Sequence, residues 1–399
     1  MEKLAIDGGT PVRTKPFPQW PVFDELEQKL LLEVLHSGKW GGTGRVKLPE
    51  VEKQFAEIHQ AKHAVSVVNG TLAITVALQA AGVQPGDEVI MPPYTFFATA
   101  AAPLMFGAIP VFADIEPQSL LIDPEKVEAL ITPRTKAIIP VHIGGAPANM
   151  TRLKEIADKH GLRIIEDSAQ AVGARWEGRG VGAIGDLGTF SFQSTKNINS
   201  GEGGMILTND EQLADKAWSL VNAGRIRNGG WYQHEVIGWN MRMTEFQAAI
   251  LIGQLSRLEQ QMAVREKNAR LLTEMLKEID GIQVLEYDSR ITRHAYHLYI
   301  FKLHPDLADR VNKGDVCRKL NAEGIPVFEG YVALNRNRAI QEEIRKWTGA
   351  YRSDSCPVAE RLCEKEALWM PQNVLLGDEN DIRDIAQAIR KVIRSYKAS

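Results

Sequence analysis

The feature that most constrains this sequence is an alternation of short apolar runs with helical patterns between about residues 62 and 210. Such runs are AVSVV (64–68), EVIM (88–91), PVFADI (110–115), TKAIIPVHI (135–143) and RIIED (163–167). Apolar strands separated by helices are typical of a parallel sheet covered on both faces. GTFSFQ (188–193) and GGMILTN (203–209) then follow each other closely, which predicts adjacent strands joined by a loop. We therefore predict an α/β fold with a mostly parallel central sheet flanked by helices.

The sequence beyond residue 210 has a different pattern. A long helical pattern from Thr244 to Ile279 predicts a connecting helix. After it, AYHLYIFKL and IPVF indicate strands of a smaller α+β unit, and DENDIRDIAQAIRKVIRSY indicates a final helix. We expect a large cofactor-binding domain over residues 31–255 and a small domain, with the connecting helix, over 256–399. Residues 1–30 are expected to pack on the small domain.

Charge and composition exclude several classes of protein. The 399 residues include 47 basic and 50 acidic side chains, so no basic field favours nucleic acid or an anionic membrane. Residues 89–113 are uncharged, but four prolines and a glycine interrupt them, which predicts strand, turn, helix and strand rather than a membrane span. The three cysteines form no CxxC pair, and the histidines show no metal-ligand spacing, so no metal site is predicted. We expect a cytoplasmic protein.

Chemically distinctive residues follow three of the predicted strands, where open α/β sheets bind ligands. Asn69-Gly70-Thr71 lies between a strand and a helix, and is either a phosphate cradle or an ordinary helix cap. Asp167 closes RIIED, where it is placed either to hold a cationic nitrogen or to cap a helix. Lys196, in SFQSTKNINSGEGG, is either a solvated lysine or a site for a Schiff base.

Together these residues match the needs of one cofactor. Pyridoxal 5′-phosphate requires a phosphate cup, a carboxylate opposite the pyridinium nitrogen and a lysine for the aldehyde. Chain order supplies all three in Gly70-Thr71, Asp167 and Lys196. Phe96, at another strand end, offers a face on which the cofactor ring can stack.

Longer stretches carry a resemblance to a known family. They are GGTPVR, NGTLAITVAL, GDEVIMPPYTFFATA, PVFADI, IIPVHIGG, IIEDSAQAVGA, FSFQSTKNINSGEGGMI, GWNMRMTEFQAAI and CPVAERL. In this order they span nearly the whole chain and resemble the DegT/DnrJ/EryC1/StrS sugar aminotransferases. That resemblance implies the fold type I architecture of aspartate aminotransferase.

The resemblance implies a role for each matching residue. Lys196 matches the lysine that forms the internal aldimine and shuttles a proton, and Asp167 matches the aspartate that pairs with the pyridine nitrogen. Gln170 matches a residue near the ring hydroxyl, and Phe96 matches the stacking aromatic residue. The positions that match phosphate-binding residues are Gly70, Thr71, Ser191 and, from a neighbouring subunit, Asn240. The resemblance therefore implies a homodimer with shared active sites.

The implied reaction is a ping-pong transamination with pyridoxamine 5′-phosphate as the intermediate cofactor form. An amino-acid donor, glutamate or glutamine, would supply nitrogen to a ketone of a cyclitol or sugar. The GEGG block and the PFPQWP opening are similar to the keto-cyclitol branch and to 3-amino-5-hydroxybenzoate synthase. The alternatives are a dehydratase or aromatising lyase that uses the same cofactor, and a non-catalytic sensor. A lysine at position 196, where related dehydratases carry histidine, favours transamination.

Three further residues are candidates for contact with substrate. His297, in YHLYIF, matches a histidine that commonly lies near the substrate in the family. Tyr331 lies in FEGYVALNRNRAI, which departs from the more usual Tyr-x-Pro-Leu-His pattern. His142 ends an apolar strand near the predicted site, where it is either a ligand-binding residue or a core histidine with satisfied hydrogen bonds.

Overall fold

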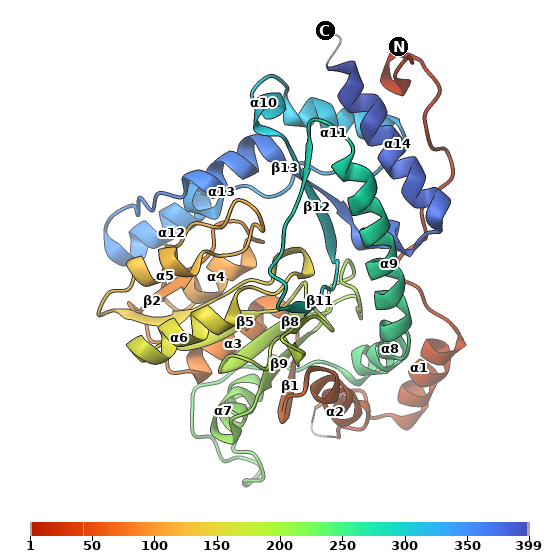
Figure 1. Cartoon of the computed structure of the whole chain (residues 1–399). Coiled ribbons are helices and arrows are strands. Elements are labelled where there is room, and N and C mark those ends of the chain that lie inside the picture. Colours follow the sequence, from red (N-terminus) through yellow and green to blue (C-terminus); the bar gives the residue numbers. More distant parts are fainter. Residues whose placement is uncertain (1, 43, 397–399) are drawn as a thin grey trace.

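A seven-stranded sheet forms the centre of the molecule and carries helices on its faces (Figure 1). The structure is a computed structural model and describes residues 2–42 and 44–396. The strands run in the order β1-β9-β8-β5-β4-β2-β3. Their bounds are β1 (His63–Val67), β2 (Glu88–Met91), β3 (Ile109–Phe112), β4 (Thr135–Ile138), β5 (Arg163–Asp167), β8 (Leu187–Ser191) and β9 (Gly204–Thr208).

The sheet is mostly parallel, as predicted. Strand β9 is antiparallel to both of its neighbours, β1 and β8, and every other neighbouring pair is parallel. The runs EVIM and RIIED form β2 and β5 over the predicted residues. The predicted strand 135–143 is shorter, because Pro140 has no N–H for the ladder and only a bridge from Val141 to Asp167 resumes the pairing.

Helices from the same half of the chain pack around this sheet. They are α2 (Lys47–His59), α3 (Gly70–Ala80), α4 (Ala98–Leu104), α5 (Pro124–Ala129), α6 (Met150–His160) and α7 (Glu211–Val221). The uncharged segment 89–113 forms β2, the buried helix α4 and β3, as predicted. A short 3-10 turn, η2 (Ile143–Gly145), follows β4, and a small sheet joins β6 (Arg175–Trp176), β7 (Arg179–Gly180) and β11 (Ile291–Arg293).

The predicted connecting helix is divided in two. Helix α8 (Glu245–Ser256) ends before Arg257, and α9 (Leu258–Lys277) begins after it. The guanidinium group of Arg257 turns to Asp24, at 2.8 Å, and to Glu27. These two residues lie at the start of α1 (Glu25–Ser37), which packs along α8. The break therefore coincides with an ion-pair contact between the two helices.

The last third of the chain forms a second layer around a three-stranded sheet. Its strand order is β10-β12-β13. The strands are β10 (Ile282–Val284), β12 (Leu298–Leu303) and β13 (Ala367–Pro371), and the α-helices are α10 (Pro305–Ala308), α11 (Lys313–Ala322), α12 (Arg338–Thr348), α13 (Pro357–Arg361) and α14 (Glu379–Ser395). Three short helical turns complete it: η3 (Leu334–Arg336), η4 (Leu362–Glu366) and η5 (Gln372–Leu376).

The N-terminal segment, which includes the turn η1 (Ala5–Asp7), packs on this second layer. Leu4 belongs to its apolar core, and Arg13 forms a salt bridge of 2.8 Å with Asp381 of α14. Figure 1 shows the N-terminal segment beside α14. The expected segment 1–30 is divided, however, because residues from Glu25 onward form α1 and pack on α8. The two further domain bounds stay predictions.

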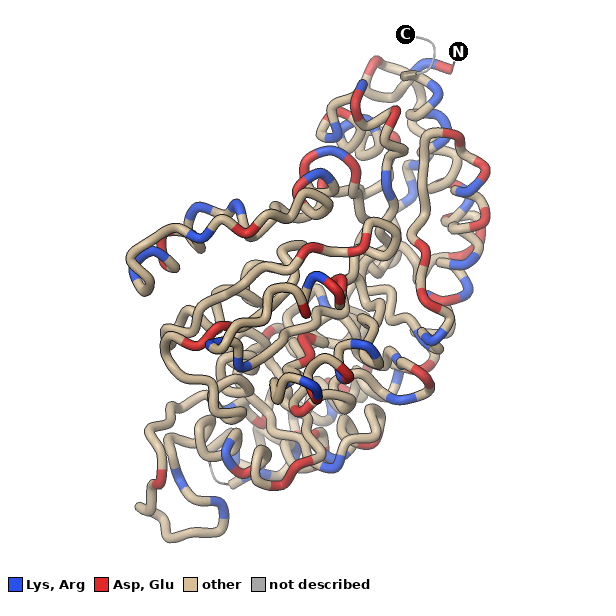
Figure 2. Tube along the Cα trace, turned by 60° about the vertical axis from the view of Figure 1, so that its left-hand side comes forward, with Lys and Arg blue, Asp and Glu red and all other residues tan. Residues whose placement is uncertain are grey.

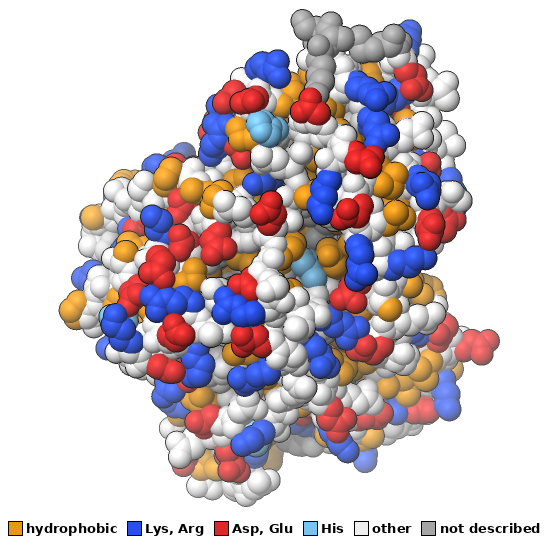
Figure 3. All heavy atoms as spheres, viewed as in Figure 1, with side chains coloured by type: hydrophobic (Ala, Val, Ile, Leu, Met, Phe, Trp, Pro, Cys, Tyr) orange, Lys and Arg blue, Asp and Glu red, His pale blue; other side chains and the backbone are white. Residues whose placement is uncertain are grey.

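Charges of both signs are interleaved along the chain (Figure 2) and across the face shown in Figure 3. Figure 3 shows no extended area of one sign on that face. Among the described residues, no helix is both long and apolar enough to cross a membrane.

Candidate active site

Three strand ends meet at one edge of the central sheet. Strands β1 and β8 are both antiparallel to β9, and β5 is parallel to β8, so β1, β5 and β8 point the same way. Their carboxyl ends lead to Gly70, Asp167 and Ser191. The topology thus brings the predicted cradle, carboxylate and phosphate-binding serine to a single edge, which is where open α/β sheets bind ligands.

The start of α3 lies directly against the end of β8. A Cβ atom at Gly70 would come within 2.7 Å of the Ser191 Cβ, so only glycine permits this approach. Asn69 is the helix N-cap and accepts a hydrogen bond from the N–H of Leu72. Among the described residues no group caps the N–H of Gly70 or Thr71, and the helix dipole favours an anion there. The cap and the anion cradle are therefore compatible, with Asn69 serving as the cap.

Asp167 is a buried carboxylate without a salt-bridge partner among the described residues. It is 6% exposed and accepts hydrogen bonds from the Thr99 hydroxyl, at 2.8 Å, and from the N–H of Ala169, at 3.2 Å. Burial raises the pKa of Asp167, whereas these hydrogen bonds and the charge of Lys196 act to lower it. A cationic group of a ligand would therefore stabilise the charge of this buried carboxylate.

Lys196 lies in the loop between β8 and β9. Burial lowers the pKa of its amine to about 8, and the negative charge of Asp167 acts in the opposite direction. An amine with this pKa is partly neutral near physiological pH, which both nucleophilic attack and proton transfer require. The indole N–H of Trp20 donates to the carbonyl of Ser194 at 3.0 Å, so the N-terminal segment helps to hold this loop.

Gln170 and Tyr331 link the two layers of the molecule. The Gln170 side chain accepts from the N–H of Gly144, at 2.7 Å, and donates to the Tyr331 hydroxyl, at 2.8 Å. Burial raises the pKa of Tyr331 to about 12, and the charge of Asp167 adds to this shift. The Tyr331 ring also meets the buried Tyr94 edge-on, with 5.4 Å between ring centroids. Tyr331 therefore belongs to the surroundings of Asp167.

Phe96 and Asn240 are both exposed. Phe96, just before α4, is 60% exposed and is thus free to cover a ligand ring. Asn240 pairs with Asn222 in an isolated bridge, and its side chain faces outward between the buried Met241 and the exposed Trp239. This exposure leaves Asn240 free to reach a second copy of the chain.

His142 is not available to a substrate in this structure. Its Nε2 lies 2.9 Å from a carboxylate oxygen of Glu166, its Nδ1 accepts from the N–H of Ala148 at 3.0 Å, and the side chain is fully buried. Although burial acts to raise it, the pKa of Glu166 lies below its usual value, because His142 and backbone N–H groups stabilise its charge. Of the two roles considered for His142, a ligand-binding residue or a core histidine, these contacts favour the core histidine.

His297 lies beside the lysine loop. Its Nδ1 is 3.1 Å from the Asn197 Oδ1, and Asn197 directly follows Lys196. Burial holds the pKa of His297 well below its usual value, and the charges of Lys196 and Arg265 add to the effect. Sequence reasoning missed Thr99 and Asn197. The spacing of Thr95 and Thr99 by one helical turn is the only local sign of the first.

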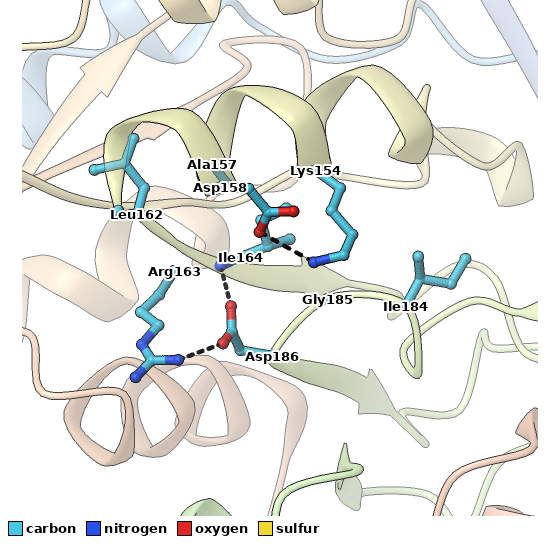
Figure 4. Close-up of a pocket in the computed structure, with 10 residues that line it drawn as sticks. Lys154, Ala157, Asp158, Leu162, Arg163, Ile164, Ile184, Gly185 and Asp186 are labelled. Carbon is cyan, nitrogen blue, oxygen red and sulfur yellow. Dashed lines mark hydrogen bonds and ion pairs between the residues drawn. The ribbon is translucent and has the colours of Figure 1, made fainter.

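Other parts of the described chain offer weaker candidates. A surface hollow of 350 Å³ lies at the start of β5, the end opposite Asp167, and Figure 4 shows the residues that line it. Its charged side chains are already paired, Arg163 with Asp186 and Lys154 with Asp158. No group of three or more His, Cys, Asp or Glu side chains in the described residues is arranged to hold a metal ion.

The residues at the sheet edge fit pyridoxal phosphate. The uncapped N–H groups and Ser191 suit its phosphate, the buried and unpaired Asp167 suits its ring nitrogen, and the amine of Lys196 suits its aldehyde. Each of these observations concerns a different part of the cofactor.

Comparisons with known proteins point to the same chemistry. The model of the DegT/DnrJ/EryC1/StrS aminotransferase family matches residues 21–390. The chain is 39% identical to an L-glutamine:2-deoxy-scyllo-inosose aminotransferase of Streptomyces kanamyceticus, over 98% of this chain and 97% of that one.

Two solved structures are similar over nearly the whole chain. The crystal structure of 3-amino-5-hydroxybenzoic acid synthase superposes with a TM-score of 0.88 at 33% identity, covering 96% of this chain and all of that chain. NtdA from Bacillus subtilis, with bound cofactor PMP, superposes with a TM-score of 0.82 at 29% identity, covering 96% and 86%.

Proposed function

The chain belongs to the DegT/DnrJ/EryC1/StrS aminotransferase family, and from that premise we propose that it transfers an amino group from glutamine to a ketone of a cyclitol. The family assignment makes it an aminotransferase, as the sequence predicted. The name of the relative from Streptomyces kanamyceticus supports both the donor and the acceptor class. Glutamate as the donor and a keto-sugar as the acceptor are the nearest alternatives.

The observation that carries the proposal is the position of Lys196 and Asp167 at the edge where α3 begins. Pyridoxal 5′-phosphate, when bound, supplies an aldehyde that carries the amino group and a ring that withdraws electrons from the reacting carbon. NtdA, which holds PMP, supports this choice of cofactor. The residues proposed to hold it are Gly70, Thr71, Ser191, Asp167, Gln170, Phe96, Lys196 and Asn240 of a partner subunit.

Lys196 is the proposed proton carrier. With a pKa of about 8, roughly a tenth of the free amine is neutral at pH 7, which is enough to accept a proton from the donor carbon. The same group, once protonated, returns a proton to the former ketone carbon of the acceptor. One residue thus serves both halves of the reaction, and the proton balance closes over the cycle.

Asp167 is the proposed partner of the ring nitrogen. Its carboxylate is fixed by Thr99 and the N–H of Ala169, so it can hold a proton on that nitrogen without moving. Burial strengthens the interaction because water does not screen it. Gln170 is proposed to meet the ring hydroxyl, and Tyr331, which accepts a hydrogen bond from Gln170 at 2.8 Å, stays a candidate for contact with substrate.

We propose a homodimer with shared sites that works in the cytoplasm. The exposed Asn240 and the apolar side chains near it, Trp231, Tyr232 and Ile237, support a partner surface. All three cysteines are free thiols, which suits a reducing compartment.

The test is a two-step assay on purified protein. Protein loaded with pyridoxal phosphate is mixed first with L-glutamine and then, after removal of the donor, with a keto-cyclitol, and the product is identified by mass. We expect a gain of nitrogen by the ketone, no product with Lys196→Ala, and a loss of about 10³-fold with Asp167→Ala.

Other results would identify the alternatives. A product that has lost water without gaining nitrogen would indicate a dehydratase or lyase. A cofactor spectrum that no donor changes would indicate a sensor.

A further inference from the structure

The orientation of Asn197 can be assigned from its contacts. Its Nδ2 donates to the backbone carbonyl of Ala295 at 2.6 Å. The opposite orientation of the amide would place two acceptor oxygens against each other at that distance. The Oδ1 atom therefore faces His297, whose Nδ1 lies 3.1 Å away.

This contact fixes the tautomer of His297. An amide oxygen only accepts hydrogen bonds, so Nδ1 of His297 must carry the proton. Burial and two nearby cations, Lys196 and Arg265, oppose a second proton on the ring. The neutral ring then has a bare lone pair on Nε2.

Arg265, the second of these two cations, is charged at neutral pH. Its side chain is fully buried on α9, it has no acidic partner among the described residues, and its Nε donates to Gln372 at 3.0 Å. Burial lowers its pKa to about 9, which still leaves it charged at neutral pH. The guanidinium group also lies 5.3 Å from the centre of the Trp20 ring, whose N–H donates to the carbonyl of Ser194 in the loop that carries Lys196.

Among the residues that the structure describes, the lone pair on Nε2 of His297 has no hydrogen-bond partner. Within the described residues the ring makes a hydrogen bond only through Nδ1, and Nε2 is not among the fully buried atoms that lack a partner. The residue is 6% exposed, and because Nε2 lacks a partner without being fully buried, it contributes to that exposure. His297 thus offers one accessible acceptor beside the lysine that carries the chemistry.

We propose that His297 Nε2 accepts a hydrogen bond from a hydroxyl group on the carbon next to the ketone of the acceptor, and that Asn197 is the positioning residue that fixes this acceptor. The inference rests on the proposed function and adds a substrate feature, a hydroxyl group vicinal to the reacting carbonyl. It also assigns a function to Asn197.

The chemistry of the surroundings selects the hydroxyl. A carboxylate has no proton to donate to a bare nitrogen, and an ammonium group would be repelled by Lys196 and Arg265. A hydroxyl group donates without bringing charge. The charge of Lys196 acts on the His297 ring, so the two side chains are near each other, and on this basis we assign the group that His297 reaches to the carbon next to the one that Lys196 serves.

The first test compares two ketones. Enzyme in the pyridoxamine form is given 2-hydroxycyclohexanone or cyclohexanone, and the ratio of their kcat/KM values is measured. We expect wild type to prefer the hydroxylated ketone by at least about tenfold. His297→Leu and Asn197→Leu should both bring the ratio close to one.

A matched control is His294→Leu. His294 lies three residues away, is similarly buried at 7% exposure, and its Nε2 is a fully buried atom. Its replacement should leave the ratio unchanged. An equal ratio in wild type and His297→Leu, with amination still measurable, would overturn the inference alone. Absence of amination with every ketone would instead overturn the proposed function.

The second test does not depend on activity. Nitrogen-15 spectra of the histidine rings report which nitrogen carries the proton. We expect His297 to show a protonated Nδ1 and a bare Nε2 in wild type, and a mixture of tautomers in Asn197→Leu. A protonated Nε2 in the wild-type protein would contradict the assignment.

Discussion

Burial sets the charge of Lys196, the residue at the centre of the proposed chemistry. Its amine has a pKa of about 8, and the nearby Asp167 limits how far burial can lower that value. Two measurable consequences follow from these opposed effects, one kinetic and one thermodynamic.

The kinetic consequence is a pH profile for cofactor capture. Only the neutral amine attacks an aldehyde, so the rate of pyridoxal phosphate binding to the cofactor-free protein should rise with pH and level off above about 8. In Asp167→Asn the opposing charge is gone, and the inflection should move to lower pH. Stopped-flow absorbance measures both profiles. An inflection near the usual value of a lysine would show that the amine is not buried in solution.

The thermodynamic consequence concerns the cofactor-free protein. The pKa of Lys196 is about 8 in the folded chain, against 10.5 for an ordinary lysine. Between these two pH values folding releases a proton, so the free energy of unfolding rises as the pH rises from about 8 to about 10.5. Lys196→Met should therefore increase the free energy of unfolding at pH 7, and the gain should disappear at high pH. Urea unfolding at several pH values measures it. A destabilised variant at pH 7 would contradict this account.

At the scale of single elements, the site depends on how closely α3 approaches β8. Gly70→Ala would place a Cβ 2.7 Å from that of Ser191. We expect a loss of stability of about 1–3 kcal/mol and at least about tenfold weaker cofactor binding, measured by urea unfolding and by titration. A second change, Ser191→Gly, should restore part of the stability. Gly41→Ala, where a Cβ meets no atom within 4 Å, is the control and should change neither quantity.

A buried side chain at the end of a helix holds the N-terminal segment in place. Glu323, at the end of α11, is fully buried, accepts from the N–H groups of Ala5 and Val12, and pairs with Lys391 of α14 at 2.9 Å. Glu323→Ala should lower the free energy of unfolding by about 3–5 kcal/mol, because the buried Lys391 then keeps only the carbonyl of Thr10 and the exposed carboxylate of Glu2, at 3.8 Å. It should also expose the segment to proteases. The exposed Lys15→Ala should cost no more than about 1 kcal/mol.

At the scale of the whole molecule, a dimer with shared sites predicts that two impaired variants regain activity when they are combined. Lys196→Ala and Asn240→Ala each impair every site of a homodimer. If Asn240 acts on the partner's site, a heterodimer of the two variants has one site with both residues intact. Mixing and reassembling equal amounts should then restore about a quarter of wild-type activity. No restoration would mean that Asn240 acts within its own subunit.

Much of this site was predictable from the sequence, for a local reason. Apolar strands separated by helices predicted the sheet. The residues at or soon after strand ends, Gly70, Asp167 and Lys196, predicted the cofactor chemistry. These assignments depend only on neighbours within a few positions. The break at Arg257 was not predictable, because it accompanies an ion pair with Asp24, far away in the sequence.

The sequence by itself determined the order of the strands along the chain and the residues placed at their ends, since periodicity and strand-to-helix junctions are local properties. Only the tertiary structure decided which distant side chains complete the site. Thr99 reaches Asp167 across 68 positions, Asn197 meets His297 across 100 and Gln170 meets Tyr331 across 161. It also decided how two histidines differ. Both ring nitrogens of His142 have hydrogen-bond partners, whereas His297 has a partner only on Nδ1 among the described residues. A hydrogen bond depends on direction and burial, and both are fixed only when distant segments pack together.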